Sequence, residues 1–173
     1  ALTVDADVVR PELSTLAYLA LLAIGLPLVA AWQRSAWYVG AAAIVVGVLV
    51  HQIGHFTFDD PVILAWFLVV VWGALACLAF LVSARSEPSM APSSLVVDGA
   101  SLIYALAAFA YGCAPVVEPV RARPDGLLVV ASALLAALFV GHARRRRVPW
   151  LLWPAAVVGH VFVLDVLRLV PSR

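Results

Sequence analysis

The chain has 173 residues, of which 65 % are hydrophobic and only 12 % are charged. Soluble domains are roughly half apolar and about a quarter charged, so this composition excludes a soluble globular fold, a disordered chain and a coiled coil. The formal net charge is +1, which gives no reason to expect a nucleic-acid partner.

The apolar runs are continuous and near twenty residues long, which predicts helices that cross a membrane. A bilayer core about 30 Å thick needs about 20 residues per helix, whereas membrane strands would alternate in polarity. We therefore expect an all-α, polytopic integral membrane helix bundle with about six transmembrane helices, folded as a single transmembrane domain over residues 1–173. In chain order, the spans are expected at 13–32, 36–56, 61–83, 96–116, 125–142 and 148–170.

Short polar segments separate these spans. The stretch 33–35 divides the first two helices, and Asp59 and Asp60 before Pro61 are expected to cap the third. The four-arginine block Arg144–Arg147 divides the last two. Because arginine is enriched in cytoplasmic loops, we expect a multi-pass protein of the cell membrane whose Arg144–Arg147 loop faces the cytoplasm and contacts lipid phosphates.

Histidines inside the spans are the main candidates for chemistry, because ionisable groups are costly in lipid. His51 and His55 lie at i and i+4, on one face of the second helix, and could chelate one metal. His160 lies in the sixth span. At 1.5 Å per residue, His51, His55 and His160 are roughly 22, 28 and 18 Å from the arginine side. We therefore expect these three to form a cofactor or metal site that holds haem b or a divalent transition metal. The alternative is that each imidazole simply bonds a neighbouring helix.

Two other ionisable residues are predicted to have ordinary roles. His142 is expected to be a solvated residue at the end of the fifth helix, and Asp98 to complement the dipole at the start of the fourth. Both lie near the arginine side, so Asp98 could face His142. The embedded Ser101 and Ser132 are linked to no histidine by the sequence.

Familiar catalytic patterns do not decide whether the protein is an enzyme. All eleven basic residues are arginine, which excludes Schiff-base chemistry on lysine and a P-loop lysine. Gln52 follows His51 where a zinc protease motif needs glutamate, and there is no GxSxG segment.

Three functions are compatible with this pattern. The first is electron transfer or membrane-embedded metal chemistry at the histidine site. The second is a small-solute transporter or a substrate-binding membrane subunit. The third is a non-catalytic accessory subunit of a membrane complex. The expected partners are the lipid bilayer and other membrane subunits or further copies of the chain.

Overall fold

The computed structural model describes residues 13–33, 35–85, 92–113 and 126–169. In this part of the chain the protein is all-α, with six helices that are long and apolar enough to cross a membrane, which confirms the expected fold class. The elements are α1 (Leu13–Gln33), α2 (Ala36–Thr57), α3 (Pro61–Arg85), α4 (Pro92–Cys113), α5 (Leu127–Arg146), a short 3-10 turn η1 (Pro149–Leu151) and α6 (Leu152–Leu169).

Three predicted boundaries differ from the structure by about one turn. Helix α6 begins at Leu152 rather than at residue 148, because the short turn η1 precedes it. Helix α4 begins at Pro92 rather than at residue 96, because proline is tolerated in the first turn of a helix. Helix α5 continues past His142 to Arg146, because cations are favoured near a helix C-terminus. The predicted helix ends at 116 and 170, and the predicted start at 125, lie outside the described residues.

The start of α3 shows how a local polar residue sets a helix end. Asp60 accepts a hydrogen bond from the backbone N–H of Val62 at 2.7 Å through its Oδ1 atom. This is the expected cap, in which a carboxylate satisfies an N–H group that has no partner within the helix.

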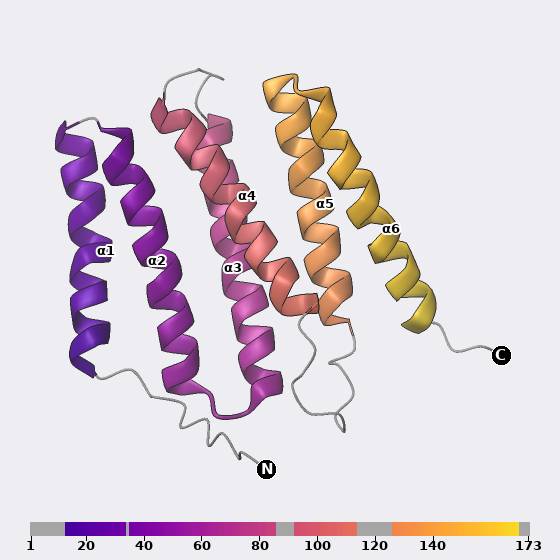
Figure 1. Cartoon of the computed structure of the whole chain (residues 1–173), viewed down its shortest axis with the longest axis horizontal. Coiled ribbons are helices and arrows are strands. Elements are labelled where there is room, and N and C mark those ends of the chain that lie inside the picture. The colour runs from indigo at the N-terminus through magenta and orange to yellow at the C-terminus, as the bar shows by residue number, and fades with distance from the viewer. Residues whose placement is uncertain (1–12, 34, 86–91, 114–125, 170–173) are drawn as a thin grey trace, which may run out of the picture.

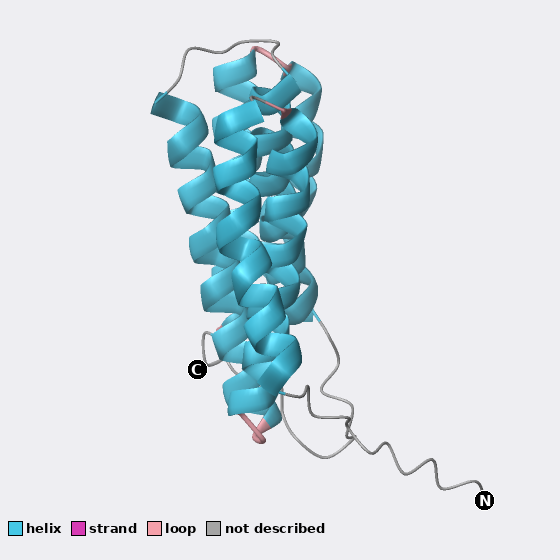
Figure 2. Cartoon of the chain, turned by 90° about the vertical axis from the view of Figure 1, so that its left-hand side faces the viewer, coloured by secondary structure: helices cyan, strands magenta, loops and turns pink. Residues whose placement is uncertain are grey.

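The helices form three hairpins that stand side by side. Figure 1 shows α1 and α2 at one edge, α3 and α4 crossing in the centre, and α5 and α6 at the other edge. Seen from the side, the same helices overlap in a narrow column, so the bundle is broad in one direction and thin in the other (Figure 2). Within the described residues, α1 packs only against α2, and α6 only against α5 and η1.

The closest packing lies in the centre, where small residues face one another. Ala76, Ala105 and Ala131 have no exposed surface. A Cβ atom added to Gly112 of α4 would lie 3.0 Å from Cβ of Ala131 in α5, which measures how closely these two helices approach. Small side chains bring helix backbones together in lipid, where no hydrophobic effect drives helices to associate. The helices at the centre of the bundle therefore pack against one another through small side chains.

Candidate functional site

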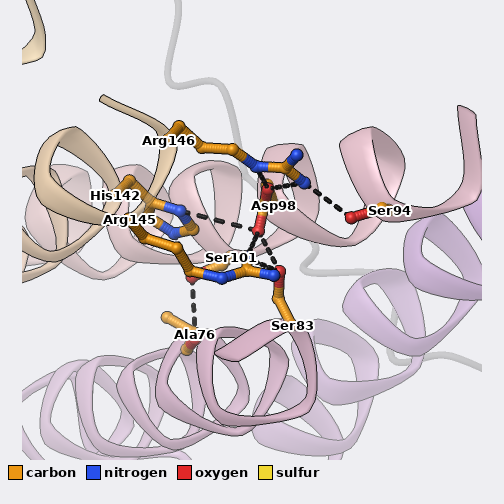
Figure 3. Close-up of polar contacts among 8 residues, drawn as sticks. All are labelled: Ala76, Ser83, Ser94, Asp98, Ser101, His142, Arg145 and Arg146. Atoms are coloured by element: carbon orange, nitrogen blue, oxygen red, sulfur yellow. Dashed lines mark hydrogen bonds and ion pairs between the residues drawn. The ribbon is translucent and has the colours of Figure 1, made fainter. Parts of the chain in front are cut away.

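Buried polar side chains gather where α3, α4 and α5 meet, at the arginine-rich end of the bundle (Figure 3). They include four of the five buried polar residues in the described part of the chain. We call this group the charged cluster, and its members are Ser83, Ser94, Asp98, Ser101, His142, Arg145 and Arg146.

Helical spacing explains why these residues meet. In α4, Ser94, Asp98 and Ser101 are separated by four and then three residues, so they share one face of the helix. In α5, His142 is followed by Arg145 and Arg146 at i+3 and i+4, which again fall on one face. Both faces turn towards α3, as Figure 3 shows.

Asp98 is the centre of the charged cluster. Only 7 % of this residue is exposed. The guanidinium group of Arg145 donates to its Oδ1 atom at 2.9 Å, and Arg146 donates to Oδ2. Ser83 also donates its hydroxyl to Oδ1. Because a buried carboxylate is costly without partners, these contacts from two neighbouring helices hold α3, α4 and α5 together.

His142 continues the charged cluster towards the middle of the membrane. Its Nδ1 atom lies 3.6 Å from Oδ1 of Asp98, and its Nε2 atom lies 3.2 Å from the hydroxyl of Ser101. The Ser101 hydroxyl in turn donates to the backbone carbonyl of Ala76 at 2.9 Å. The sequence left Ser101 without a link to histidine, and the structure supplies that link.

The order carboxylate, imidazole and hydroxyl matches the connectivity of a serine hydrolase triad. Two observations argue against that chemistry. Ser101 has no exposed surface, so a substrate carbonyl cannot reach its Oγ atom. Its hydroxyl proton is also directed to Ala76, so the Nε2 atom of His142 must donate to Ser101 rather than accept from it. The arrangement is therefore a buried hydrogen-bond network in this conformation.

These contacts correct three predictions and confirm a fourth. His142 is 1 % exposed, so the prediction of a solvated helix end is wrong, because α5 runs one turn further. Asp98 lies inside α4 and is buried, so it does more than complement the helix dipole. That Asp98 could face His142 is confirmed. Arg145 and Arg146 were expected in a loop that contacts lipid phosphates, but they belong to α5 and turn inward to Asp98.

The first two predicted site residues, His51 and His55, lie together in the last two turns of α2, at the opposite end of the bundle (Figure 1). Their ring centroids are 4.5 Å apart. The Nδ1 atom of His51 lies 2.7 Å from the hydroxyl of Tyr111, a hydrogen bond that connects α2 to α4. The pair on one helical face is therefore present, and a tyrosine that the sequence analysis did not single out joins it.

The third predicted site residue, His160, does not join that pair within one chain. Helix α6 makes no contact with α2 in the part of the chain that the structure describes, because α3, α4 and α5 separate them (Figure 1). His160 is exposed, and its Nδ1–H donates to the carbonyl of Ala156 in its own helix at 2.8 Å. The described residues contain no group of three or more His, Cys, Asp or Glu side chains placed to hold a metal ion. A similar predicted depth did not ensure proximity.

A hollow lies between α2 and α4, beside the charged cluster. Its volume is about 470 Å³, and Trp72 of α3 forms part of its wall. Glycines open it on both sides, with Gly40 and Gly47 on α2 and Gly99 on α4. No atom lies within 4 Å of the position that a Cβ atom on Gly99 would occupy. We call this feature the α2–α4 groove.

The α2–α4 groove is almost entirely apolar. Among its lining residues, only Trp72 and Tyr104 carry polar side-chain atoms, and the Tyr104 hydroxyl donates to the carbonyl of Ala43 at 2.6 Å. A second hollow of about 490 Å³ shares Gly40 with the groove and extends to Trp37 near the start of α2. The two hollows together lead from the start of α2 towards the middle of the bundle.

Comparisons with family models, with curated proteins and with solved structures find no match to this chain. What can be concluded of the protein is that it is a polytopic membrane protein, a six-helix bundle with a buried charged cluster at one end.

Proposed function

We propose that the protein binds a lipid-soluble small molecule in the α2–α4 groove, as a carrier or as the substrate-binding subunit of a membrane transporter. The observation that carries this proposal is the groove itself, an apolar hollow of about 470 Å³ lined by glycines and two aromatic rings. Ligand sites are typically clefts of about 300–1,000 Å³ with few polar groups.

The size of the α2–α4 groove favours a small molecule over a helix of another protein. An α-helix about 10 Å across occupies roughly 420 Å³ per turn. The groove would therefore take little more than one turn, whereas a partner helix would pack along the whole span. A molecule of a few tens of carbon atoms or fewer fits the hollow better.

The chemistry of the walls restricts the ligand. Since the Tyr104 hydroxyl already donates to Ala43, the groove offers a ligand few hydrogen bonds. A sugar or an amino acid would lose its hydration without compensation there. The favoured ligand is a mostly hydrocarbon molecule that carries at most one or two polar atoms.

The depth of the α2–α4 groove is suited to uptake from one membrane surface. Gly47 and Trp72 lie at its inner end, and Gly47 is about 17 Å along α2 from Ala36, near the middle of a 30 Å bilayer core. A ligand that enters beside Trp37 would thus reach the membrane centre. Binding sites of transporters commonly lie at that depth.

Filling the α2–α4 groove tests the proposal. Gly99→Leu adds a side chain where there is open space, so the fold should tolerate it while the ligand loses its room. Gly25→Leu is the matched control, because Gly25 lies on α1 outside the groove and also has no atom within 4 Å of an added Cβ. Protein purified in mild detergent is analysed by native mass spectrometry and by solvent extraction of bound small molecules.

We expect one low-mass apolar compound per chain in the wild type and in Gly25→Leu, and its loss in Gly99→Leu. A fluorescent hydrophobic probe should likewise bind Gly99→Leu at least ten-fold more weakly. If the wild type carries no such compound and the probe binds all three proteins equally, the proposal is wrong. An accessory subunit of a membrane complex would then be the better explanation.

A second candidate function is a metal or haem site at His51 and His55. The close pair of rings and the hydrogen bond from His51 to Tyr111 favour it, because a histidine ligand usually has its other ring nitrogen bonded to a polar group. Two imidazoles leave an ion incompletely coordinated, so further ligands must come from elsewhere.

The absorbance spectrum and elemental analysis of purified protein test the metal or haem site. His51→Ala is the test variant, and His160→Ala is its control. A haem band or bound metal that His51→Ala alone removes would support the site, and its absence from the wild type would refute it.

A further inference from the structure

A cationic hollow lies at the turn between α5 and α6, separate from both sites described above. Its volume is about 400 Å³, and it is lined by Val140, Ala143, Arg144, Arg147, Pro149 and Leu152. Two arginine residues therefore border one cavity with an apolar floor. We call it the arginine hollow.

The four consecutive arginines divide into two pairs. Arg145 and Arg146 point inward and bond to Asp98 (Figure 3). Arg144 and Arg147 are exposed and line the arginine hollow, and neither guanidinium group forms a hydrogen bond or ion pair with a residue that the structure describes. The charge of the inner pair is met by a carboxylate of the protein, and the outer pair is available to a ligand.

The backbone holds the outer pair together. Arg147 ends α5 in the left-handed conformation, with φ at 55°, at a position where glycine is the usual residue. The next residue, Val148, donates its N–H back to the carbonyl of Ala143 at 3.0 Å, which closes the turn. Arg144 in the last turn of α5 and Arg147 at its cap therefore both border the arginine hollow, and an anion bound there would meet two positive charges.

The surroundings place the arginine hollow at the level of lipid headgroups. Trp150 and Trp153 follow directly in the chain and are 65 % and 77 % exposed. Exposed tryptophan is typical of the interface between membrane and water. The apolar floor at Val140 and Leu152 adjoins the lipid-facing side of the bundle, where an acyl chain would lie.

We propose that the arginine hollow binds the phosphate of an anionic phospholipid. Arg144 and Arg147 would donate charge-assisted hydrogen bonds to the phosphate oxygens, and the first carbons of the lipid would pack on Leu152. Inorganic phosphate has the same charged group as the lipid but no acyl chain. Comparing the two therefore tests whether the arginine hollow binds a phospholipid or free phosphate.

The experiment measures lipid-dependent thermal stabilisation of the detergent-purified full chain. Phosphatidylglycerol, phosphatidylcholine and inorganic phosphate are titrated separately into the wild type, the double variant Arg144→Gln/Arg147→Gln and Arg85→Gln. Arg85 is the matched control, because it is an exposed arginine at the end of α3, which lies at the same end of the bundle as the end of α5 (Figure 1). It does not line the hollow.

We expect phosphatidylglycerol to raise the melting temperature of the wild type and of Arg85→Gln, and phosphatidylcholine to have little effect. Each arginine near a membrane surface contributes about 1 kcal/mol to the binding of anionic lipid. The double variant, which lacks two, should therefore need about thirty-fold more phosphatidylglycerol for the same shift in melting temperature. If inorganic phosphate stabilises as well as the lipid at equal concentration, the lipid assignment is wrong. The proposal also fails if Arg85→Gln weakens the response as much as the double variant does.

Discussion

Replacing Asp98 by asparagine should destabilise the protein more than any other change of a single charge in the described part of the chain. The substitution keeps the shape of the side chain and removes its negative charge. Arg145 and Arg146 would then keep their positive charges with side chains only 10 % and 11 % exposed. A buried charge that loses its partner is strongly unfavourable.

The size of the effect follows from the geometry. At 2.9 Å and an effective dielectric constant of about 20, the Asp98–Arg145 attraction is roughly 6 kcal/mol. The cost of removing the carboxylate from water offsets part of this, and the asparagine oxygen still accepts a hydrogen bond. Since breaking a buried ion pair typically costs about 3–5 kcal/mol, we expect Asp98→Asn to lower the free energy of unfolding by about 3 kcal/mol.

The assay is unfolding in mixed micelles of dodecyl maltoside and sodium dodecyl sulfate, followed by tryptophan fluorescence. Asp60→Asn is the matched control, because Asp60 is an exposed helix cap and asparagine caps equally well. It should change the free energy of unfolding by less than about 0.5 kcal/mol. The double variant Asp98→Asn/Arg146→Gln should be at least as stable as Asp98→Asn, since it removes one unpaired charge. Equal stability of Asp98→Asn and Asp60→Asn would refute the reasoning.

Two further predictions concern packing and orientation. Gly141→Ala should lower the free energy of unfolding by about 1–3 kcal/mol, because the added Cβ atom would lie 2.8 Å from Cζ of Phe80. Gly159→Ala should be neutral or stabilising by up to about 1 kcal/mol, because no atom lies within 4 Å of the added Cβ atom. The same micelle assay measures both, and an equal loss in the two variants would contradict this explanation. If the Arg144–Arg147 loop faces the cytoplasm, the exposed Cys113 at the far end of α4 faces outward and should react with a membrane-impermeant maleimide in intact cells. Labelling that requires permeabilised cells, or that persists in Cys113→Ser, would contradict the orientation or the assignment to this cysteine.

The six spans could be predicted from the sequence because the bilayer imposes a simple rule. A helix that crosses about 30 Å of hydrocarbon must be long and apolar, and it must satisfy its backbone hydrogen bonds internally. The boundary between α1 and α2 could also be placed, since polar residues separate them. The end of α5 could not, because Arg144 and the residues after it have the composition of a loop but continue the helix.

The charged cluster was only partly predictable for a related reason. Which residues share a helical face follows from the spacing, so the stripe of Ser94, Asp98 and Ser101 is visible in the sequence. Which neighbouring helix each face contacts depends on how the hairpins pack. The local spacing of residues in the sequence does not reveal that packing. The same limit explains His160, because the sequence does not show that α3, α4 and α5 lie between α2 and α6.

Helix α4 contributes one face to the α2–α4 groove and another face to the charged cluster. Gly99 and Ile103 border the groove, while Asp98 and Ser101 bond to α3 and α5. Successive residues on a helix point about 100° apart, so no twist of α4 about its axis moves one set without the other. A guest that widens the groove by turning this helix must also stretch the Asp98 ion pairs, and by reciprocity the strength of those pairs sets how readily the groove opens.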